Sequence, residues 1–228
     1  MAEIEGLVRA LREGDDAAKT AAARALRNHT YHNDANKDLI AEAGGIPPLV
    51  ELLRDGSANG KLWTAGALGN LARDAANRDL IAEAGGITPL VELLRDGRVE
   101  AKAEAARALW NLACDNGANK VAIAEAGGIP LLVELLRDGF ADARRSAAGA
   151  LCNLANNNAS NAVAIAAAVS LEALVQLARR GRMIVDDRSV VSNAGAKRKA
   201  ALLVAALLGG CVPDSVPRVL KAVIGSYL

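Results

Sequence analysis

Aromatic residues are nearly absent from this sequence, since Phe, Trp and Tyr make up 2% of its 228 residues, although 52% of the residues are hydrophobic. The core must therefore be built from Ala, Leu, Ile and Val, which suit closely packed helices better than a sheet. The chain also lacks charge of one sign: its formal net charge is +1, so no global field attracts nucleic acid or an anionic membrane. No apolar run is long enough to span a bilayer. We therefore expect an all-α protein that binds no nucleic acid and does not insert into a membrane.

Signals for secretion and for catalysis are missing as well. Three cysteines, Cys114, Cys152 and Cys211, have neither metal-binding nor disulfide-framework spacing, which fits a reducing compartment and predicts a cytoplasmic or nuclear location. The first residues, MAEIEG, do not have the pattern of a signal peptide. There is no phosphate-binding glycine loop, nucleophile elbow or metal signature. We expect no enzymatic activity, no catalytic residues, no cofactor, no metal and no small-molecule substrate.

One short motif recurs four times. Its copies are AARALRNHT at 22–30, TAGALGNLA at 64–72, AARALWNLA at 105–113 and AAGALCNLA at 147–155. Each copy carries an asparagine at its seventh position: Asn28, Asn70, Asn111 and Asn153. The sequence numbers of successive asparagines differ by 42, 41 and 42. A period of about 42 residues predicts a solenoid of one helical unit, in which each unit packs on its neighbours.

Each motif closes a unit of three predicted helices, which is clearest between residues 76 and 114. A short first helix ends at Gly85-Gly86, which allows a sharp reversal. A medium helix, ITPLVELLRDG, follows, and a long helix covers roughly 99–113. The first helices are expected to begin with an asparagine as N-cap: Asn36, Asn77, Asn119 and Asn161. The units span about 2–34 (partial, without a first helix), 35–75, 76–117, 118–159 and 160–209, followed by a cap at 210–228.

A helical wheel at about 100° per residue gives the long helix of the third unit two sides. Its core side consists of small and branched apolar residues: Ala105, Ala106, Ala108, Leu109, Leu112 and Ala113. Asn111 points away from the core, and Trp110 points sideways, where we expect it to be wedged between units. The positions four and seven residues before each asparagine also point outward: Arg24, Gly66, Arg107 and Gly149, then Ala21, Trp63, Glu104 and Ser146. They predict one outward stripe along the array.

These features resemble the armadillo-repeat family. The resemblance rests on the repeat period, the second helix GGIPPLVELL and the ALxNLA ending of the third helix. It covers almost the whole chain and weakens after about Arg182. The wording GGIPPLVELLRDG is most similar to the armadillo arrays of plant U-box-type proteins, and the unit also resembles β-catenin and importin-α-like solenoids. The resemblance implies a single domain, residues 1–228: an all-α, right-handed α-solenoid of about five armadillo repeats with three helices per repeat and a C-terminal capping helix.

In this family the third helices line a concave groove, and the resemblance implies that the asparagines Asn28, Asn70, Asn111 and Asn153 hold the backbone of an extended peptide. An amide side chain offers donors and an acceptor, so it can bind both the N–H and the C=O of one peptide unit. Stacked helices lie about 8–10 Å apart, and an extended chain advances about 3.3 Å per residue. One asparagine then meets roughly every second or third peptide residue. The alternative is that each asparagine only caps the last turn of a helix.

Four further side chains on the outward stripe are candidate peptide contacts. Trp63 is a candidate anchor, because Gly66 one turn later leaves space above it; its alternative is packing against the neighbouring third helix. Arg24 and Arg107 favour acidic peptides, or else belong to a solvated face. Glu104 and Arg107 also have the three-residue spacing of an ordinary helix pair. The resemblance to importin-α implies tryptophans four residues before the asparagines, but these are absent here. Two of these positions are cationic instead, which disfavours a basic cargo.

The fifth unit departs from the pattern. It lacks the Gly-Gly reversal, and its long helix, near 197–208, starts about ten residues late, which predicts an insertion at 182–196. Ala205 stands where the repeat has asparagine. Because the insertion contains several apolar residues, we expect it to plug or narrow the last part of the groove and to limit binding to units one to four. A solvated loop is the alternative.

The sequence thus predicts a non-enzymatic protein-binding scaffold or adaptor, which holds an extended peptide segment of a partner protein in the groove of the third helices. Two alternatives remain open. The chain can be the substrate-recognition fragment of a larger enzyme, such as a U-box ubiquitin ligase, or an engineered consensus armadillo array.

Overall fold

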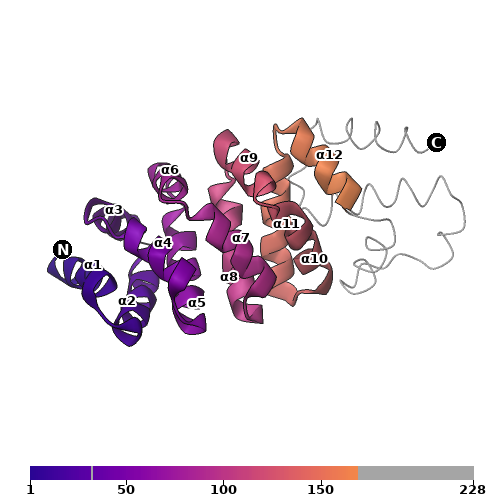
Figure 1. Ribbon diagram of the computed structural model, residues 1–228. Coiled ribbons are helices and arrows are strands. Elements are labelled where there is room, and N and C mark those ends of the chain that lie inside the picture. The colour runs from indigo at the N-terminus through magenta and orange to yellow at the C-terminus, as the bar shows by residue number, and fades with distance from the viewer. Residues whose placement is uncertain (32, 169–228) are drawn as a thin grey trace, which may run out of the picture.

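The computed structural model describes residues 1–31 and 33–168, which form twelve helices and no strand (Figure 1). The second helices of successive units are α1 (Ala2–Glu13), α4 (Ile46–Asp55), α7 (Ile87–Asp96) and α10 (Gly128–Asp138). The third helices are α2 (Asp16–His29), α5 (Ala58–Leu71), α8 (Val99–Leu112) and α11 (Ala141–Ala155). The first helices are α3 (Asp34–Glu42), α6 (Ala75–Glu83), α9 (Gly117–Glu125) and α12 (Ala159–Ala168). The predicted insertion at 182–196, the late helix near 197–208 and the cap at 210–228 lie outside the described residues.

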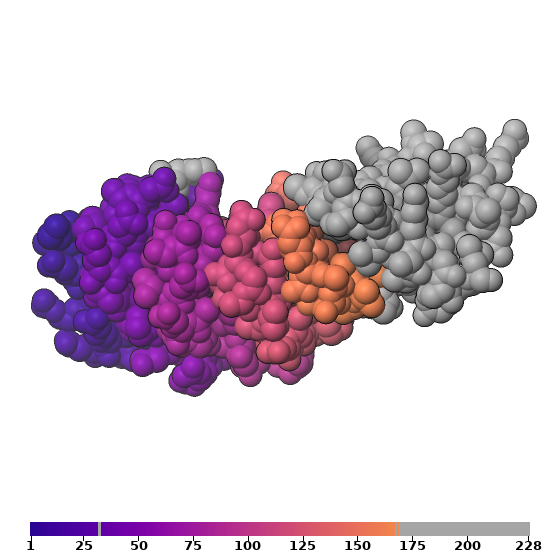
Figure 2. Space-filling view, turned by 90° about the horizontal axis from the view of Figure 1, so that it is seen from above, coloured from indigo at the N-terminus to yellow at the C-terminus, as the bar shows by residue number. Residues whose placement is uncertain are grey.

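The units follow one another along the long axis of the described part, so that each unit contacts its neighbours (Figures 1 and 2). The predicted core side of the third helices is confirmed: Leu26, Leu68 and Leu109 are completely buried, and Leu151 is 1% exposed. These four leucines occupy the same place in successive motifs, two positions before each asparagine. The all-α solenoid predicted from the period is therefore confirmed. No helix of the described part has the length and apolar character needed to cross a membrane.

The Gly-Gly pairs reverse the chain between the first and second helices, as predicted. The first glycine of each pair has a left-handed backbone, with φ of 67° at Gly44, 77° at Gly85 and 80° at Gly127. The second glycine allows close packing, because an added Cβ at Gly86 would lie 2.8 Å from Ile81 Cγ2 and 3.2 Å from Val50 Cγ2. The reversal therefore places each first helix against the second helix of the preceding unit.

The predicted starts of the first helices were wrong. The N-cap residues lie three positions earlier, where Asn33, Asp74 and Asn116 accept hydrogen bonds from the backbone N–H of Asn36, Asn77 and Asn119 at 3.0–3.1 Å. Two amide or carboxylate side chains lie at the start of each first helix, and either one is a suitable cap by residue type. In each case the backbone N–H of the later residue donates to the side chain of the earlier one, so the earlier residue is the N-cap.

In α3, α9 and α12, the later asparagine ties the first helix to the third helix before it. Asn119 Nδ2 donates to Leu112 O at 3.1 Å, and Asn161 Nδ2 donates to Leu154 O at 3.2 Å. Asn36 Nδ2 makes the equivalent bond to His29 O at 2.9 Å. Asn119 and Asn161 are almost completely buried, at 3% and 5% exposure. These side chains are therefore buried donors rather than helix caps.

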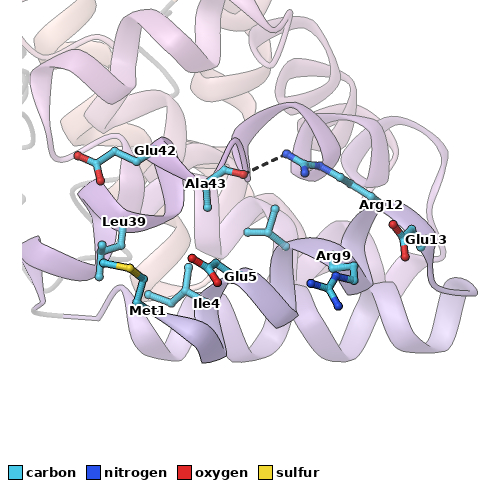
Figure 3. Close-up of a pocket in the computed structure, with 10 residues that line it drawn as sticks. Met1, Ile4, Glu5, Arg9, Arg12, Glu13, Leu39, Glu42 and Ala43 are labelled. Carbon is cyan, nitrogen blue, oxygen red and sulfur yellow. Dashed lines mark hydrogen bonds between the residues drawn. The ribbon is translucent and has the colours of Figure 1, made fainter.

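The first unit has no first helix, as predicted, and α1 presents charged residues at this end of the array. A hollow of about 410 Å³ lies between α1 and α3, with Glu5, Arg9 and Glu13 among its lining residues (Figure 3). Arg12 also lines it and donates from Nη2 to Ala43 O and Gly44 O, both at 3.0 Å. Arg12 thus satisfies carbonyl groups at the end of α3, which gives this part of the hollow a structural role.

Candidate peptide-binding face

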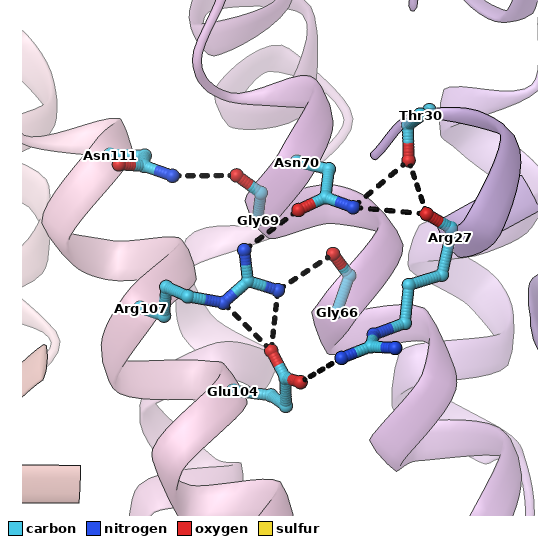
Figure 4. A network of polar contacts seen from close by, with 8 residues as sticks. All are labelled: Arg27, Thr30, Gly66, Gly69, Asn70, Glu104, Arg107 and Asn111. Carbon is cyan, nitrogen blue, oxygen red and sulfur yellow. Dashed lines mark hydrogen bonds and ion pairs between the residues drawn. The ribbon is translucent and has the colours of Figure 1, made fainter. Parts of the chain in front are cut away.

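The candidate site is the outward side of α2, α5, α8 and α11, which we call the third-helix face. It carries the repeated asparagines and the side chains four and seven positions before them. The structure brings Arg24 and Trp63 together across one unit boundary, and Asn70 together with Arg107 and Glu104 across the next (Figure 4). Asn28 has no such contact among the described residues. The face is not uniformly open, however: Gly66, Asn70 and Ser146 are buried.

Each repeated asparagine from the second unit onward bonds to the third helix of the unit before it. Asn70 Nδ2 donates to Arg27 O at 3.0 Å, Asn111 Nδ2 to Gly69 O at 2.7 Å, and Asn153 Nδ2 to Trp110 O at 2.9 Å. The accepting carbonyl belongs in every case to the residue just before the preceding asparagine, in the last turn of its helix. Carbonyls there lack a partner within the helix. The asparagines therefore cap a helix end, but that of the neighbouring unit and not their own.

The four asparagines differ in which atoms of their side-chain amides have a hydrogen-bond partner among the described residues. Asn28 is exposed, and its side chain forms no hydrogen bond with the described residues. Asn70 is 3% exposed, also donates to Thr30 Oγ1 at 3.1 Å, and accepts at Oδ1 from Arg107 Nη1 at 2.7 Å. Asn111 and Asn153 are half-buried, and their Oδ1 atoms accept no hydrogen bond from the described part of the chain. Within the part of the chain that the structure describes, only Asn70 of these four thus has hydrogen bonds at both the nitrogen and the oxygen of its amide.

Glu104 joins two arginines from different units. Its Oε1 lies 2.8 Å from Arg27 Nη2, and its Oε2 lies 2.9 Å from Arg107 Nε (Figure 4). Arg107 Nη2 also donates to Gly66 O at 3.2 Å, so Arg107 reaches from α8 back to α5. The helix pair expected from the spacing of Glu104 and Arg107 is present. It is one part of a network that extends over three units.

Trp63 lies beside two guanidinium groups. The Cζ atoms of Arg24 and Arg27 lie 5.3 and 5.5 Å from its ring centroid, within the range of cation–π attraction. The prediction that Gly66 leaves open space above Trp63 was wrong, because Arg27 fills that space: an added Cβ at Gly66 would lie 2.6 Å from Arg27 Nε. Trp63 is half-buried and therefore remains partly accessible.

Large residues of one third helix lie over glycines of the next. Arg27 lies over Gly66 at the first junction, and Trp110 lies over Gly149 at the third, where an added Cβ would be 2.5 Å from the indole ring. The predicted position of Trp110 between units is thereby confirmed. Each pair combines the residue just before one asparagine with the residue four before the next.

The second junction uses the opposite arrangement. Here the earlier helix has the small residue, Gly69, and the later helix has the large one, Arg107. An added Cβ at Gly69 would lie 3.4 Å from Ala108, which is an ordinary contact distance, and Arg107 extends back to Asn70 Oδ1 and Gly66 O. Large and small residues thus alternate along the array.

Sequence reasoning missed Arg27 as a site residue. Its motif position is taken by Gly69, Trp110 and Cys152 in the other units, so no repeated residue type draws attention to it. The available signal is the glycine in the next unit, Gly66, at a position where the neighbouring units have arginine. A glycine in one unit opposite a large side chain of the neighbouring unit indicates that the large side chain extends across the boundary between the two units.

The repeated three-helix unit, the Gly-Gly reversal and the stacked third helices define an α-solenoid repeat protein. The chain belongs to the armadillo-repeat family: the family model for the Armadillo/beta-catenin-like repeat matches residues 33–73, 74–114 and 116–156, together more than half of the chain. No curated protein matches the sequence.

Solved structures similar to this chain include engineered and designed proteins. One engineered protein is 30% identical over 99% of this chain and 86% of that chain, with a TM-score of 0.75. A designed armadillo repeat protein is 27% identical over 90% of this chain and 82% of its own, with a TM-score of 0.71. Another designed armadillo repeat protein, in complex with the peptide (KR)4, is 25% identical over 99% of this chain and 100% of its own, with a TM-score of 0.70.

Proposed function

We propose that this protein is a non-enzymatic scaffold that binds an extended segment of a partner protein along the third-helix face. The observation that carries the proposal is the state of Asn111 and Asn153. Their Nδ2 atoms are bonded to Gly69 O and Trp110 O, which fixes the orientation of each amide, while each Oδ1 accepts nothing from the described residues. Two oriented acceptors, one unit apart, suit the N–H groups of an extended chain.

The fixed orientation of these amides reduces the entropy cost of peptide binding. A freely rotating asparagine loses side-chain entropy when it binds a ligand, whereas a side chain already held by a hydrogen bond loses less. The second hydrogen of each Nδ2 group remains for a peptide carbonyl. A similar designed armadillo repeat protein has a peptide, (KR)4, bound to it, which supports a peptide as the kind of ligand here. A cytoplasmic or nuclear location, and a partner that is neither nucleic acid nor lipid, belong to this proposal.

The test is a screen of immobilised short peptides, followed by fluorescence anisotropy with the peptides that bind. Asn111→Ala and Asn153→Ala are each expected to weaken binding about 5- to 10-fold, which is the loss of about one hydrogen bond. Glu51→Ala, an exposed change on α4 and away from the third-helix face, is the control and should bind like the wild type. Circular dichroism verifies that each variant is folded. If neither substitution changes the affinity for any peptide, the proposal is contradicted.

A further inference from the structure

We propose that Arg27 and Arg107 form a carboxylate site that the protein occupies with its own Glu104, and that an Asp or Glu side chain of a bound peptide competes for it beside Arg24 and Trp63. This inference rests on the proposed function and adds the chemical class of the ligand. The partner is then an extended peptide segment with acidic residues.

The arrangement around Glu104 is that of a bound carboxylate. Each of its oxygens contacts a different guanidinium, Arg27 Nη2 at 2.8 Å and Arg107 Nη2 at 2.5 Å. The two arginines come from units one and three, so the carboxylate sits where three third helices meet. Charge-assisted bonds of this kind are the ones used to recognise acidic ligands. The Glu104 side chain is 17% exposed and that of Arg27 is 33% exposed, so a ligand can reach the site from solvent.

The cluster carries more positive than negative charge. Arg24 is exposed, its guanidinium lies over Trp63, and it pairs with no carboxylate among the described residues. Together with Arg27 and Arg107 it outnumbers Glu104 three to one. A second carboxylate is therefore attracted to this part of the third-helix face, and an ammonium or guanidinium of a ligand is repelled.

The side chains of Arg27 and Arg107 are held in place by contacts other than those with Glu104. The Trp63 ring attracts the Arg27 guanidinium, and Gly66 allows Arg27 to lie directly on α5. Arg27 Nε is buried there and has no hydrogen-bond partner among the described residues. Arg107 is held by Asn70 Oδ1 and Gly66 O. A peptide carboxylate that displaces Glu104 therefore meets arginines that are already oriented.

The two halves of the third-helix face then bind different parts of a peptide, one its side chains and the other its backbone. Asn70 Oδ1 accepts from Arg107, so the amide of unit two is closed to a peptide, and this part of the face recognises side-chain charge instead. Asn111 and Asn153, in units three and four, hold peptide backbone. A ligand that satisfies both halves has acidic residues in the part that lies over α2 and α5.

The experiment measures binding of three dye-labelled hexapeptides, hexaglutamate, hexalysine and an uncharged Gly-Ser hexamer. Wild-type protein is expected to bind hexaglutamate more tightly than hexalysine, and increasingly so at low salt. Glu104→Gln is expected to raise the affinity for hexaglutamate about 5- to 10-fold and to leave the uncharged hexamer unchanged. Glu100→Gln is the matched control, since it removes the same charge one turn earlier on α8, where Glu100 is exposed. Its effect should stay below about 2-fold.

A second variant leaves the Glu104 network intact. Arg24→Gln is expected to weaken hexaglutamate binding about 3- to 10-fold, whereas Arg9→Gln, an exposed arginine on α1, should have no such effect. Equal responses to Glu104→Gln and Glu100→Gln overturn the inference, and so does the absence of hexaglutamate binding by both wild type and Glu104→Gln. If peptides bind through Asn111 and Asn153 with no dependence on acidic residues, the inference fails while the proposed function stands. If no peptide depends on those asparagines, the proposed function itself fails.

Discussion

At the scale of single residues, the repeated asparagine combines two functional groups that point to different partners. The amide nitrogen satisfies a carbonyl of the preceding unit, and the amide oxygen faces away from it. The same residue type is therefore explained by both packing and binding, and the balance between the two differs from unit to unit. Asn70 lies at the packing extreme and Asn28 at the exposed one.

This difference predicts graded effects on stability. Asn70→Ala removes bonds to Arg27 O, Thr30 Oγ1 and Arg107 Nη1, and it leaves buried groups unpaired, so it should cost about 2–3 kcal/mol of unfolding free energy. Asn28→Ala should stay within about 0.5 kcal/mol, since it is an exposed change. Urea denaturation followed by circular dichroism measures both. Equal losses would show that the network around Asn70 adds no stability.

The packing of Trp110 over Gly149 predicts that the effect of Gly149→Ala on stability changes sign when the indole ring is removed. Gly149→Ala should destabilise the wild type by about 1–3 kcal/mol, because the new methyl group meets the indole ring. In a Trp110→Ala background the same substitution should instead stabilise by about 0.5–1 kcal/mol, because alanine is the better helix former once the ring is gone. The two values come from one double-mutant cycle in guanidinium chloride. A favourable effect of Gly149→Ala in both backgrounds would mean that the ring does not lie there.

At the scale of elements, the first helices depend on two polar residues with opposite hydrogen-bonding roles. In α9, Asn116 accepts from the Asn119 backbone N–H, whereas the Asn119 side chain donates to Leu112 O. An oxygen is needed at the first position and an N–H group at the second. A substitution that keeps only one of these groups therefore separates the two roles.

Asn116→Ser keeps an oxygen acceptor and should change stability by less than about 1 kcal/mol. Asn119→Asp removes the donor and directs a carboxylate at carbonyl oxygens in a site that is 3% exposed, so it should cost about 2–4 kcal/mol. Thermal unfolding at neutral pH distinguishes them. If Asn119 were the N-cap, as its position in the sequence suggested, aspartate would be tolerated there.

Asn77 follows the repeated asparagine before it by seven residues, whereas Asn119 and Asn161 follow theirs by eight. In the two longer spacings, Asp115 and Asn157 have positive φ values of 48° and 54°. Asn77 is buried, and its Nδ2 has no hydrogen-bond partner among the described residues. Arg78 takes over the contact between units, donating to Ala72 O at 3.0 Å and to Cys114 O at 2.7 Å.

At the scale of the whole molecule, stability is the sum of units and of the contacts between neighbours, so position in the array matters. Leu26 and Leu109 are both fully buried leucines in the same motif position. Leu109→Ala, in a unit with neighbours on both sides, should cost about 2–5 kcal/mol. Leu26→Ala should cost less, because the first unit unfolds with fewer broken contacts. Urea melts combined with amide hydrogen exchange measure both, and equal costs argue against a linear array.

The sequence predicts most of the fold and part of the site, for physical reasons that can be named. The period, the Gly-Gly turns and the core leucines are local patterns that repeat, and all were confirmed. The helix starts were misplaced because Asn33 and Asn36, or Asn116 and Asn119, are equally good caps by type. The contact of Arg27 with Glu104 joins residues 77 positions apart in two non-adjacent units, and no single unit contains it. The role of the asparagines in peptide binding stays a prediction.

The alternation of large and small residues at the junctions limits how such a gene can lengthen or shorten. Loss of the third unit alone would place Gly69 opposite Gly149 and leave a void, and a tandem copy of it would press Trp110 against Arg107. Loss or gain of units two and three together restores a large residue opposite a glycine at every junction. We therefore expect the fold to tolerate the loss or gain of a pair of units better than that of a single repeat.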